Sequence, residues 1–144
     1  MFAHFGKVAP PEKIRELTIE LIEQLRGDGI ERVGAIGFCL GAKLLAANSA
    51  LVGATAYIHP SGFTVEEAKG YRGPVALLPS QDEDKELMKN FWAALSETAK
   101  KDGVFQTFPV HHGFAAGRSD WNDPELGKHA HEAFELAASV LAKA

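Results

Sequence analysis

The chain has 144 residues, of which 46% are hydrophobic and 24% charged, an average composition for a globular protein and a length suited to one domain over residues 1–144. Fifteen Lys and Arg residues against nineteen Asp and Glu residues give a net charge of −4, so we expect neither a nucleic-acid partner nor docking on an anionic membrane. No apolar run approaches the roughly twenty residues needed to cross a bilayer, and the N-terminus lacks the basic region of a signal peptide. We therefore expect a cytoplasmic protein.

The first half of the chain predicts two helices and two strands in alternation. After Pro10-Pro11, apolar residues recur at helical spacing from Ile14 to Leu25, which predicts an amphipathic helix of about fifteen residues that ends before Gly27. Residues 33–38 form a short, continuously apolar run, typical of a strand that is buried on both faces of a parallel sheet. Residues 40–50 are rich in Ala and Leu and predict a helix. Residues 53–58 then predict a second strand, which leads into His59 and its exit loop.

The second half continues the same alternation. Residues 74–78 predict a third strand, residues 88–95 a helix with one apolar face, and residues 104–110 a fourth strand. Asp123 is a good N-cap for a last helix with an apolar stripe that runs to the C-terminus. Strands that alternate with helices imply right-handed crossovers. We therefore predict an α/β fold with a mostly parallel sheet and helices on both faces.

The most informative motif is Gly37-Phe38-Cys39-Leu40-Gly41, which lies where a buried strand ends and a helix begins. This is the pattern of a nucleophile elbow with cysteine in place of serine. The nucleophile of an elbow occupies a strained tight turn, so we expect both glycines to avoid collisions with the neighbouring strand or helix. Cys39 would face the positive end of the following helix, which favours a thiolate, and the Leu40 N–H would point to a developing oxyanion.

An elbow needs a histidine and an acid, which come later in the chain from loops at the ends of successive strands. Asp82 follows the third predicted strand and His112 the fourth, so the order is nucleophile, acid, histidine. Because the carboxyl ends of parallel strands lie at one edge of a sheet, we expect these side chains to meet Cys39 there. His112 would accept the thiol proton, with His111 as the alternative base, and Asp82 would orient the imidazole.

Four motifs taken in order resemble the dienelactone hydrolases (carboxymethylenebutenolidases), cysteine-using members of the α/β-hydrolase fold: Gly37-Phe38-Cys39-Leu40-Gly41, His59-Pro60-Ser61, Gln81-Asp82 and His112-Gly113-Phe114-Ala115. The His-Pro-Ser tripeptide is similar to the fungal branch, and the likeness runs from about Glu31 to the C-terminal helix. The resemblance implies that Cys39 is the nucleophile, His112 the base and Asp82 the acid. It also implies action on esters or lactones without a metal or an organic cofactor.

The resemblance carries further expectations for the site. Arg118 is similar to an arginine that often follows the family's histidine motif, which implies that it anchors substrate, and His59 would be a loop histidine near the substrate pocket rather than a catalyst. The acidic loop departs from the family pattern, so Asp84 is a second candidate for the acid. A complete member is longer, with first strands that would precede Met1, so we expect a fold that lacks its N-terminal part.

These observations favour a cysteine-dependent hydrolase of small esters or lactones with a Cys-His-Asp triad. The alternative is a catalytically impaired, truncated hydrolase that acts as an interaction module or, through Cys39, as a thiol sensor. Without the first strands, residues 33–38 would lie at a sheet edge with unpaired backbone groups, so we expect a homodimer through that edge.

Overall fold

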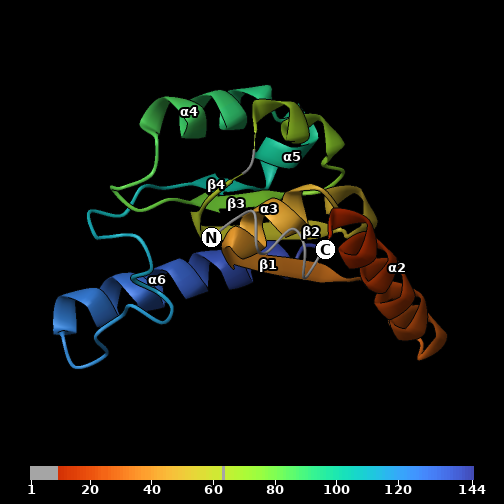
Figure 1. Cartoon of the computed structure of the whole chain (residues 1–144), viewed down its shortest axis with the longest axis horizontal. Coiled ribbons are helices and arrows are strands. Elements are labelled where there is room, and N and C mark those ends of the chain that lie inside the picture. Colours follow the sequence, from red (N-terminus) through yellow and green to blue (C-terminus); the bar gives the residue numbers. More distant parts are fainter. Residues whose placement is uncertain (1–9, 63) are drawn as a thin grey trace.

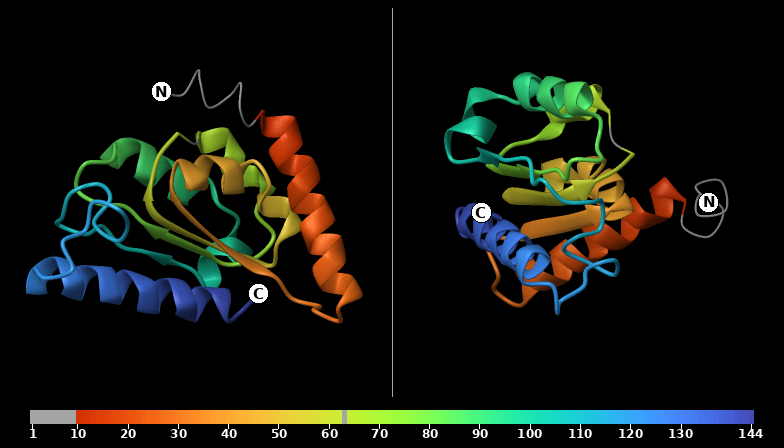
Figure 2. Two further views of the ribbon diagram at one scale, coloured as in Figure 1. Left: turned by 60° about the horizontal axis from the view of Figure 1, so that its bottom comes forward. Right: turned by 90° about the vertical axis from the view of Figure 1, so that its left-hand side faces the viewer.

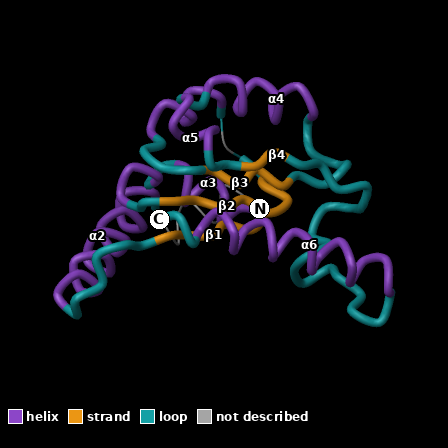
Figure 3. Tube along the Cα trace, turned by 180° about the vertical axis from the view of Figure 1, so that it is seen from behind, coloured by secondary structure: helices purple, strands orange, loops and turns teal. Residues whose placement is uncertain are grey.

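A computed structural model describes residues 10–62 and 64–144 of the chain (Figure 1). Its centre is a four-stranded sheet in which every neighbouring pair of strands is parallel. The strands lie in chain order, with one outer edge formed by the first strand and the other by the last (Figure 3). They are β1 (Gly34–Cys39), β2 (Ala54–Pro60), β3 (Val75–Leu78) and β4 (Val104–Phe105). This arrangement confirms the predicted α/β fold.

Helices cover both faces of the sheet, as predicted (Figure 2). One face carries α3 (Leu40–Ala46), α4 (Lys85–Ala94), α5 (Glu97–Lys101) and the short 3-10 turns η1 (Ser49–Leu51) and η2 (Val65–Gly70). The long α6 (Pro124–Leu141) packs across the opposite face. The remaining helix, α2 (Pro11–Gly27), stands beside the sheet and buries only Ile22. None of the described helices is long and apolar enough to cross a membrane.

The alternation of side chains along the inner strands divides the core into two layers. Tyr57 and Leu77 face the α4 side, where they pack with Phe91. Ile58 and Leu78, one position later in each strand, face α6 on the other side. Both inner strands are buried along their whole length, because each is paired on both edges and covered on both faces.

Two predicted elements are shorter than expected. The strand predicted over residues 104–110 is regular only at Val104–Phe105. The backbone N–H groups of Gln106 and Phe108 still donate to the carbonyls of Leu77, in β3, and of Pro79, just after it. The helix predicted over residues 40–50 is divided into α3 and η1, and α5 was not predicted.

The first strand is an edge of the described sheet, as expected for residues 33–38. The prediction that this run is buried on both faces is wrong for β1: only Gly37 is buried, and Ile36 is 41% exposed. Its exposure follows from its edge position, since β1 pairs with β2 alone among the described strands. The Gly37–Gly41 motif therefore begins on an edge strand of the described sheet.

Candidate active site

Cys39 occupies the junction between β1 and α3, as its last strand residue and the N-cap of the helix. Its backbone has φ 49° and ψ −121°, a conformation that non-glycine residues rarely adopt, and its thiol is free and exposed. A Cβ at Gly37 would lie 2.8 Å from the Gly41 carbonyl oxygen, so only glycine fits there. The same expectation for Gly41 is wrong, because no described atom lies within 4 Å of a Cβ at that position.

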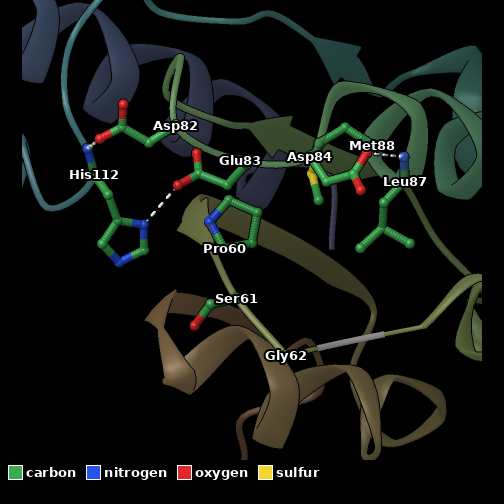
Figure 4. A pocket seen from close by; sticks show the side chains of 9 residues that line it. All are labelled: Pro60, Ser61, Gly62, Asp82, Glu83, Asp84, Leu87, Met88 and His112. Carbon is green, nitrogen blue, oxygen red and sulfur yellow. Dashed lines mark hydrogen bonds and ion pairs between the residues drawn. The ribbon is translucent and has the colours of Figure 1, made fainter.

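His112 lies between the thiol and a carboxylate. Its Nε2 atom is 3.1 Å from Cys39 Sγ, and its Nδ1 atom is 2.5 Å from Glu83 Oε1. His112 comes from the loop that follows β4, and Glu83 comes from the turn between β3 and α4. The predicted meeting of the strand ends therefore occurs, and it brings His112 rather than His111 to Cys39. Figure 4 shows the His112 ring directed at the Glu83 carboxylate.

The acid is where the structure departs from the prediction. Neither Asp82 nor Asp84 reaches the His112 ring. Asp82 instead accepts a hydrogen bond of 2.8 Å from the backbone N–H of His112. Asp84 is the N-cap of α4 and accepts hydrogen bonds from the backbone N–H groups of Glu86 and Leu87 (Figure 4). The hydrogen-bonded set is therefore cysteine, histidine and glutamate.

Hydrogen bonds from Ser80 hold the Glu83 carboxylate in place. Its side chain is only 6% exposed, and its carboxylate accepts hydrogen bonds from the Ser80 hydroxyl, at 3.1 Å, and from the Ser80 backbone N–H. The carboxylate thus has three donors, two from Ser80 and one from the His112 ring. A buried carboxylate with this many partners is fixed in one orientation, which fixes the imidazole in turn.

The pKa values of the pair shift toward a thiolate and an imidazolium. Burial raises the pKa of Cys39, but hydrogen bonds with His112 and Ser61 and the backbone N–H of Leu40 lower it, and the net pKa is below the ordinary value. Burial lowers the pKa of His112, whereas the hydrogen bonds and charges of Glu83 and Cys39 raise it, and the net pKa is above the ordinary value. The two shifts favour the same charge-separated pair.

Ser61 is a neighbour of the thiol that the sequence analysis did not assign to the site. Its hydroxyl lies 3.7 Å from Cys39 Sγ, and its backbone N–H donates to the Cys39 carbonyl at 3.1 Å. The available signal was its position just after β2, at the same sheet edge as Cys39. The structure also brings the Leu40 N–H to the thiol, where it contributes to the lowered pKa of Cys39.

A cavity of about 300 Å³ opens beside His112 (Figure 4). It is lined by Pro60, Ser61, Gly62, Asp82, Glu83, Asp84, Leu87, Met88 and His112. Arg118 is not among these residues; it is exposed and its aliphatic stem lies over Gly113. Its role in anchoring substrate stays a prediction. Within the described residues, no group of three or more His, Cys, Asp or Glu side chains is arranged to hold a metal ion.

His59 is not the loop residue that the sequence suggested. It is the penultimate residue of β2 and only 1% exposed, so it lines neither the surface nor the cavity. Its ring lies behind His112, with 4.9 Å between the ring centroids. The expectation of a loop histidine is therefore wrong, because an extra residue in β2 turns His59 into the core, where it contacts the cavity-lining His112 without lining the cavity itself.

Comparison with known proteins assigns the chain to a family and finds two relatives in a fission yeast. The sequence profile of the dienelactone hydrolase family matches residues 4–144. Two Schizosaccharomyces pombe relatives are both described as uncharacterized AIM2 family proteins: C977.15 is 34% identical over 95% of this chain, and C30D10.14 is 31% identical over 86%. The chain spans 56% and 51% of their lengths, which is about half. No solved structure is significantly similar to it.

Both relatives are fungal, as the His-Pro-Ser tripeptide suggested. The family profile covers nearly the whole chain, and its parallel sheet with flanking helices forms part of an α/β-hydrolase fold. The chain therefore belongs to the dienelactone hydrolase family.

Proposed function

We propose that the protein is a cysteine-dependent hydrolase of small esters or lactones, with Cys39 as nucleophile, His112 as base and Glu83 as the acid that orients it. The observation that carries this proposal is the continuous contact from Sγ through the imidazole to the carboxylate, at 3.1 Å and 2.5 Å. Family membership supports hydrolysis in general. Since the chain spans about half of its relatives, the activity of this chain is part of the proposal.

The reaction would begin with transfer of the Cys39 proton to Nε2 of His112. The thiolate then attacks the substrate carbonyl carbon, and the Leu40 backbone N–H stabilises the oxyanion. His112 returns the proton to the leaving alkoxide as the C–O bond breaks, which leaves a thioester on Cys39. Water then attacks the thioester while His112 accepts its proton, and the acid product and the free thiol are released.

Glu83 has two tasks in this scheme. It keeps the hydrogen on Nδ1 of His112, so that Nε2 is free to accept the thiol proton. Its negative charge, held in a mostly buried position, stabilises the imidazolium that forms in each half of the reaction. Ser61 would contribute a hydroxyl beside the sulfur, which stabilises the thiolate before attack.

The test is the hydrolysis of p-nitrophenyl acetate and a small aryl lactone by the wild-type chain, Cys39→Ala and His112→Ala. A matched control is His131→Ala, which removes a histidine that is 75% exposed on α6. We expect both site variants to reduce the enzyme-dependent rate to background and the control to leave it unchanged. An undiminished rate in Cys39→Ala would rule out the proposed nucleophile.

The alternative function as a thiol sensor has one observation in its favour: Cys39 is exposed, and its pKa is lowered. A sensor would oxidise under mild peroxide and recover with a thiol reductant, without turnover of esters. Mass spectrometry of Cys39 after such treatment, together with the esterase assay, separates the two functions. An unmodified Cys39 would remove the sensor.

A further inference from the structure

The end of β2 contains a bulge that leaves one histidine, His59, out of register with β1. Phe38 pairs with Ile58, and the next residue of β1, Cys39, pairs with Pro60, so His59 is an extra residue with no partner in β1. Such a bulge changes the direction in which a side chain points. His59 has φ +40°, in the left-handed region that non-glycine residues adopt at a cost.

The bulge moves the His59 side chain to the other face of the sheet. Strand alternation would place residue 59 on the same side as Tyr57, under α4. Its ring instead lies among aromatic side chains of the α6 layer, 5.8 Å from the Phe38 ring and 5.7 Å from the Phe114 ring. It meets the His112 ring edge to face, at 4.9 Å between centroids. The backbone strain thus brings an imidazole directly behind the catalytic base.

The two ring nitrogens of His59 add a second energetic cost to this placement, besides the strained backbone. Both ring nitrogens are buried, and neither has a hydrogen-bond partner in another described residue. A buried polar group without a partner is destabilising, so its presence calls for an explanation. Hydrogen bonding therefore does not explain why the ring is there, whereas its contact with His112 does.

We propose that His59 is a positioning residue for the Cys39–His112 pair, and that it acts through contact of its ring with the His112 ring. This inference rests on the thiolate–imidazolium pair of the proposed function. The ring of His59 limits the movement of His112 away from Sγ, and its π system attracts the imidazolium that forms when His112 takes the thiol proton. Histidine suits the position on two counts: it supplies an aromatic ring, and it tolerates a positive φ better than most residues.

The electrostatic surroundings are consistent with a neutral His59. Burial, followed by the charge of His112, lowers the pKa of His59 to about 4, and His111 adds a smaller effect in the same direction. The other titratable groups at this place, Cys39 and Glu83, both contact His112. His59 is therefore neutral at neutral pH, whereas the raised pKa of His112 favours its doubly protonated form, so the edge-to-face contact of the two rings is attractive rather than repulsive.

The experiment compares His59→Phe, which keeps an aromatic ring, with His59→Leu, which keeps the apolar volume and removes the ring. The measurement is the rate constant for alkylation of Cys39 by iodoacetamide between pH 5 and pH 9. We expect His59→Leu to react roughly three- to tenfold more slowly at pH 7, with a raised apparent pKa of Cys39. His59→Phe should stay within about twofold of the wild type. The control His129→Leu removes a half-buried histidine on α6 that packs edge to face against Phe108.

A second set of variants separates positioning from general damage to the fold. In a His112→Ala background, His59→Leu should cause no further slowing, because the effect passes through His112. The proposal is overturned by equal slowing in that background, by wild-type reactivity of His59→Leu, or by a His59→Phe as slow as His59→Leu. An ordinary thiol pKa in the wild-type chain, indifferent to His112→Ala, overturns the proposed function and this inference together. If the wild-type thiol has a lowered pKa that depends on His112, but His59→Leu leaves its reactivity unchanged, only this inference is overturned.

The wild-type protein provides a measurement that survives a failure of His59→Leu to fold. In ¹H–¹⁵N spectra of the histidine rings, His59 should stay neutral from pH 5 to pH 8 while its chemical shifts follow the titration of His112. A His59 that gains a proton in this range, or whose shifts ignore His112, contradicts the proposed ring contact.

Discussion

The Nδ1 atom of His112 lies 2.5 Å from Oε1 of Glu83, while the neighbouring Asp82 binds the backbone N–H of the same histidine. Two consecutive acidic residues thus hold one histidine by two different groups, the ring and the main chain. The division predicts that the two carboxylates differ sharply in their effect on catalysis.

Glu83→Gln should reduce kcat/KM for ester hydrolysis by at least about tenfold and raise the apparent pKa of Cys39. The amide removes the charge that stabilises the imidazolium and can present its NH₂ group to Nδ1, which favours the wrong tautomer. A matched control is Glu86→Gln, three residues later, whose side chain is 76% exposed and pairs with Lys89. Equal activity of the two variants would contradict the assignment of Glu83.

Asp82→Asn should keep most of the activity, within about threefold of the wild type, because the amide oxygen can still accept the His112 backbone N–H. Asp82→Ala removes this acceptor and should destabilise the loop by about 1 kcal/mol. Denaturant unfolding and the esterase assay measure the two effects. A loss of activity in Asp82→Asn as large as in Glu83→Gln would restore Asp82 as the catalytic acid.

The shifted pKa values predict how the reactivity of the thiol depends on pH. Because the pKa of Cys39 is lowered, the midpoint of the alkylation profile should lie below the ordinary pKa of 9.0. His112→Ala should move that midpoint to higher pH. The two shifted groups contribute to the free energy of unfolding in opposite pH ranges. The contribution of His112, whose pKa is raised, is fully present below its ordinary 6.5 and is lost as the pH rises through the folded-state value. The contribution of Cys39 is present above 9.0 and is lost as the pH falls through its lowered value. An alkylation profile with an ordinary midpoint, unaffected by His112→Ala, would contradict the ion pair.

The two glycines of the elbow should respond differently to alanine. Gly37→Ala places a methyl group against the backbone of Gly41 and Ala42 and should destabilise the fold by about 3 kcal/mol or more. Gly41→Ala lies in α3 with open space around it and should stabilise the helix by up to about 1 kcal/mol. Thermal unfolding of the two variants checks the contrast. A stable Gly37→Ala would show that the elbow adapts to a side chain.

The exposed edge of β1 leads us to predict a homodimer, because a strand with a free edge can pair with the same strand of a second copy. Ile36, which is 41% exposed in β1, would lie in that contact. Light scattering at two protein concentrations should show dimers, and Ile36→Lys should shift the equilibrium to monomers. The control Leu17→Lys changes an exposed apolar residue of α2, away from the strand. A monomer at all concentrations would remove the prediction.

The positions of Cys39 and His112 could be predicted because they depend on topology. Parallel strands place their carboxyl ends at one edge of the sheet, so a motif after β1 and a loop after β4 must converge there. The same rule brings the turn after β3 to the site, but it does not decide which side chain of that turn faces the histidine. Asp84 could have been set aside, since an aspartate just before a helix with an apolar face is a typical N-cap.

The choice between Asp82 and Glu83 depends on tertiary detail that spacing does not contain. Consecutive residues of a turn point in different directions, and the hydrogen bonds from Ser80 to Glu83 select the one that faces the ring. The placement of His59 was unpredictable for a related reason. A bulge reverses which residues face which side of a sheet, and it arises here from pairing with a strand twenty residues away in sequence.

The edge position of β1 has a consequence for how the protein loses function as it warms. Cys39, the proposed nucleophile, ends a strand with a single described neighbour, whereas Glu83 follows β3, which is paired on both sides. Segments with few partners open before the rest of a fold, and hydrogen exchange reports such partial opening. The thiol would therefore part from its histidine while the core of the sheet is still intact, and the amides of β1 should exchange faster than those of β2 and β3. Heat would then switch the chemistry off some degrees before it unfolds the protein.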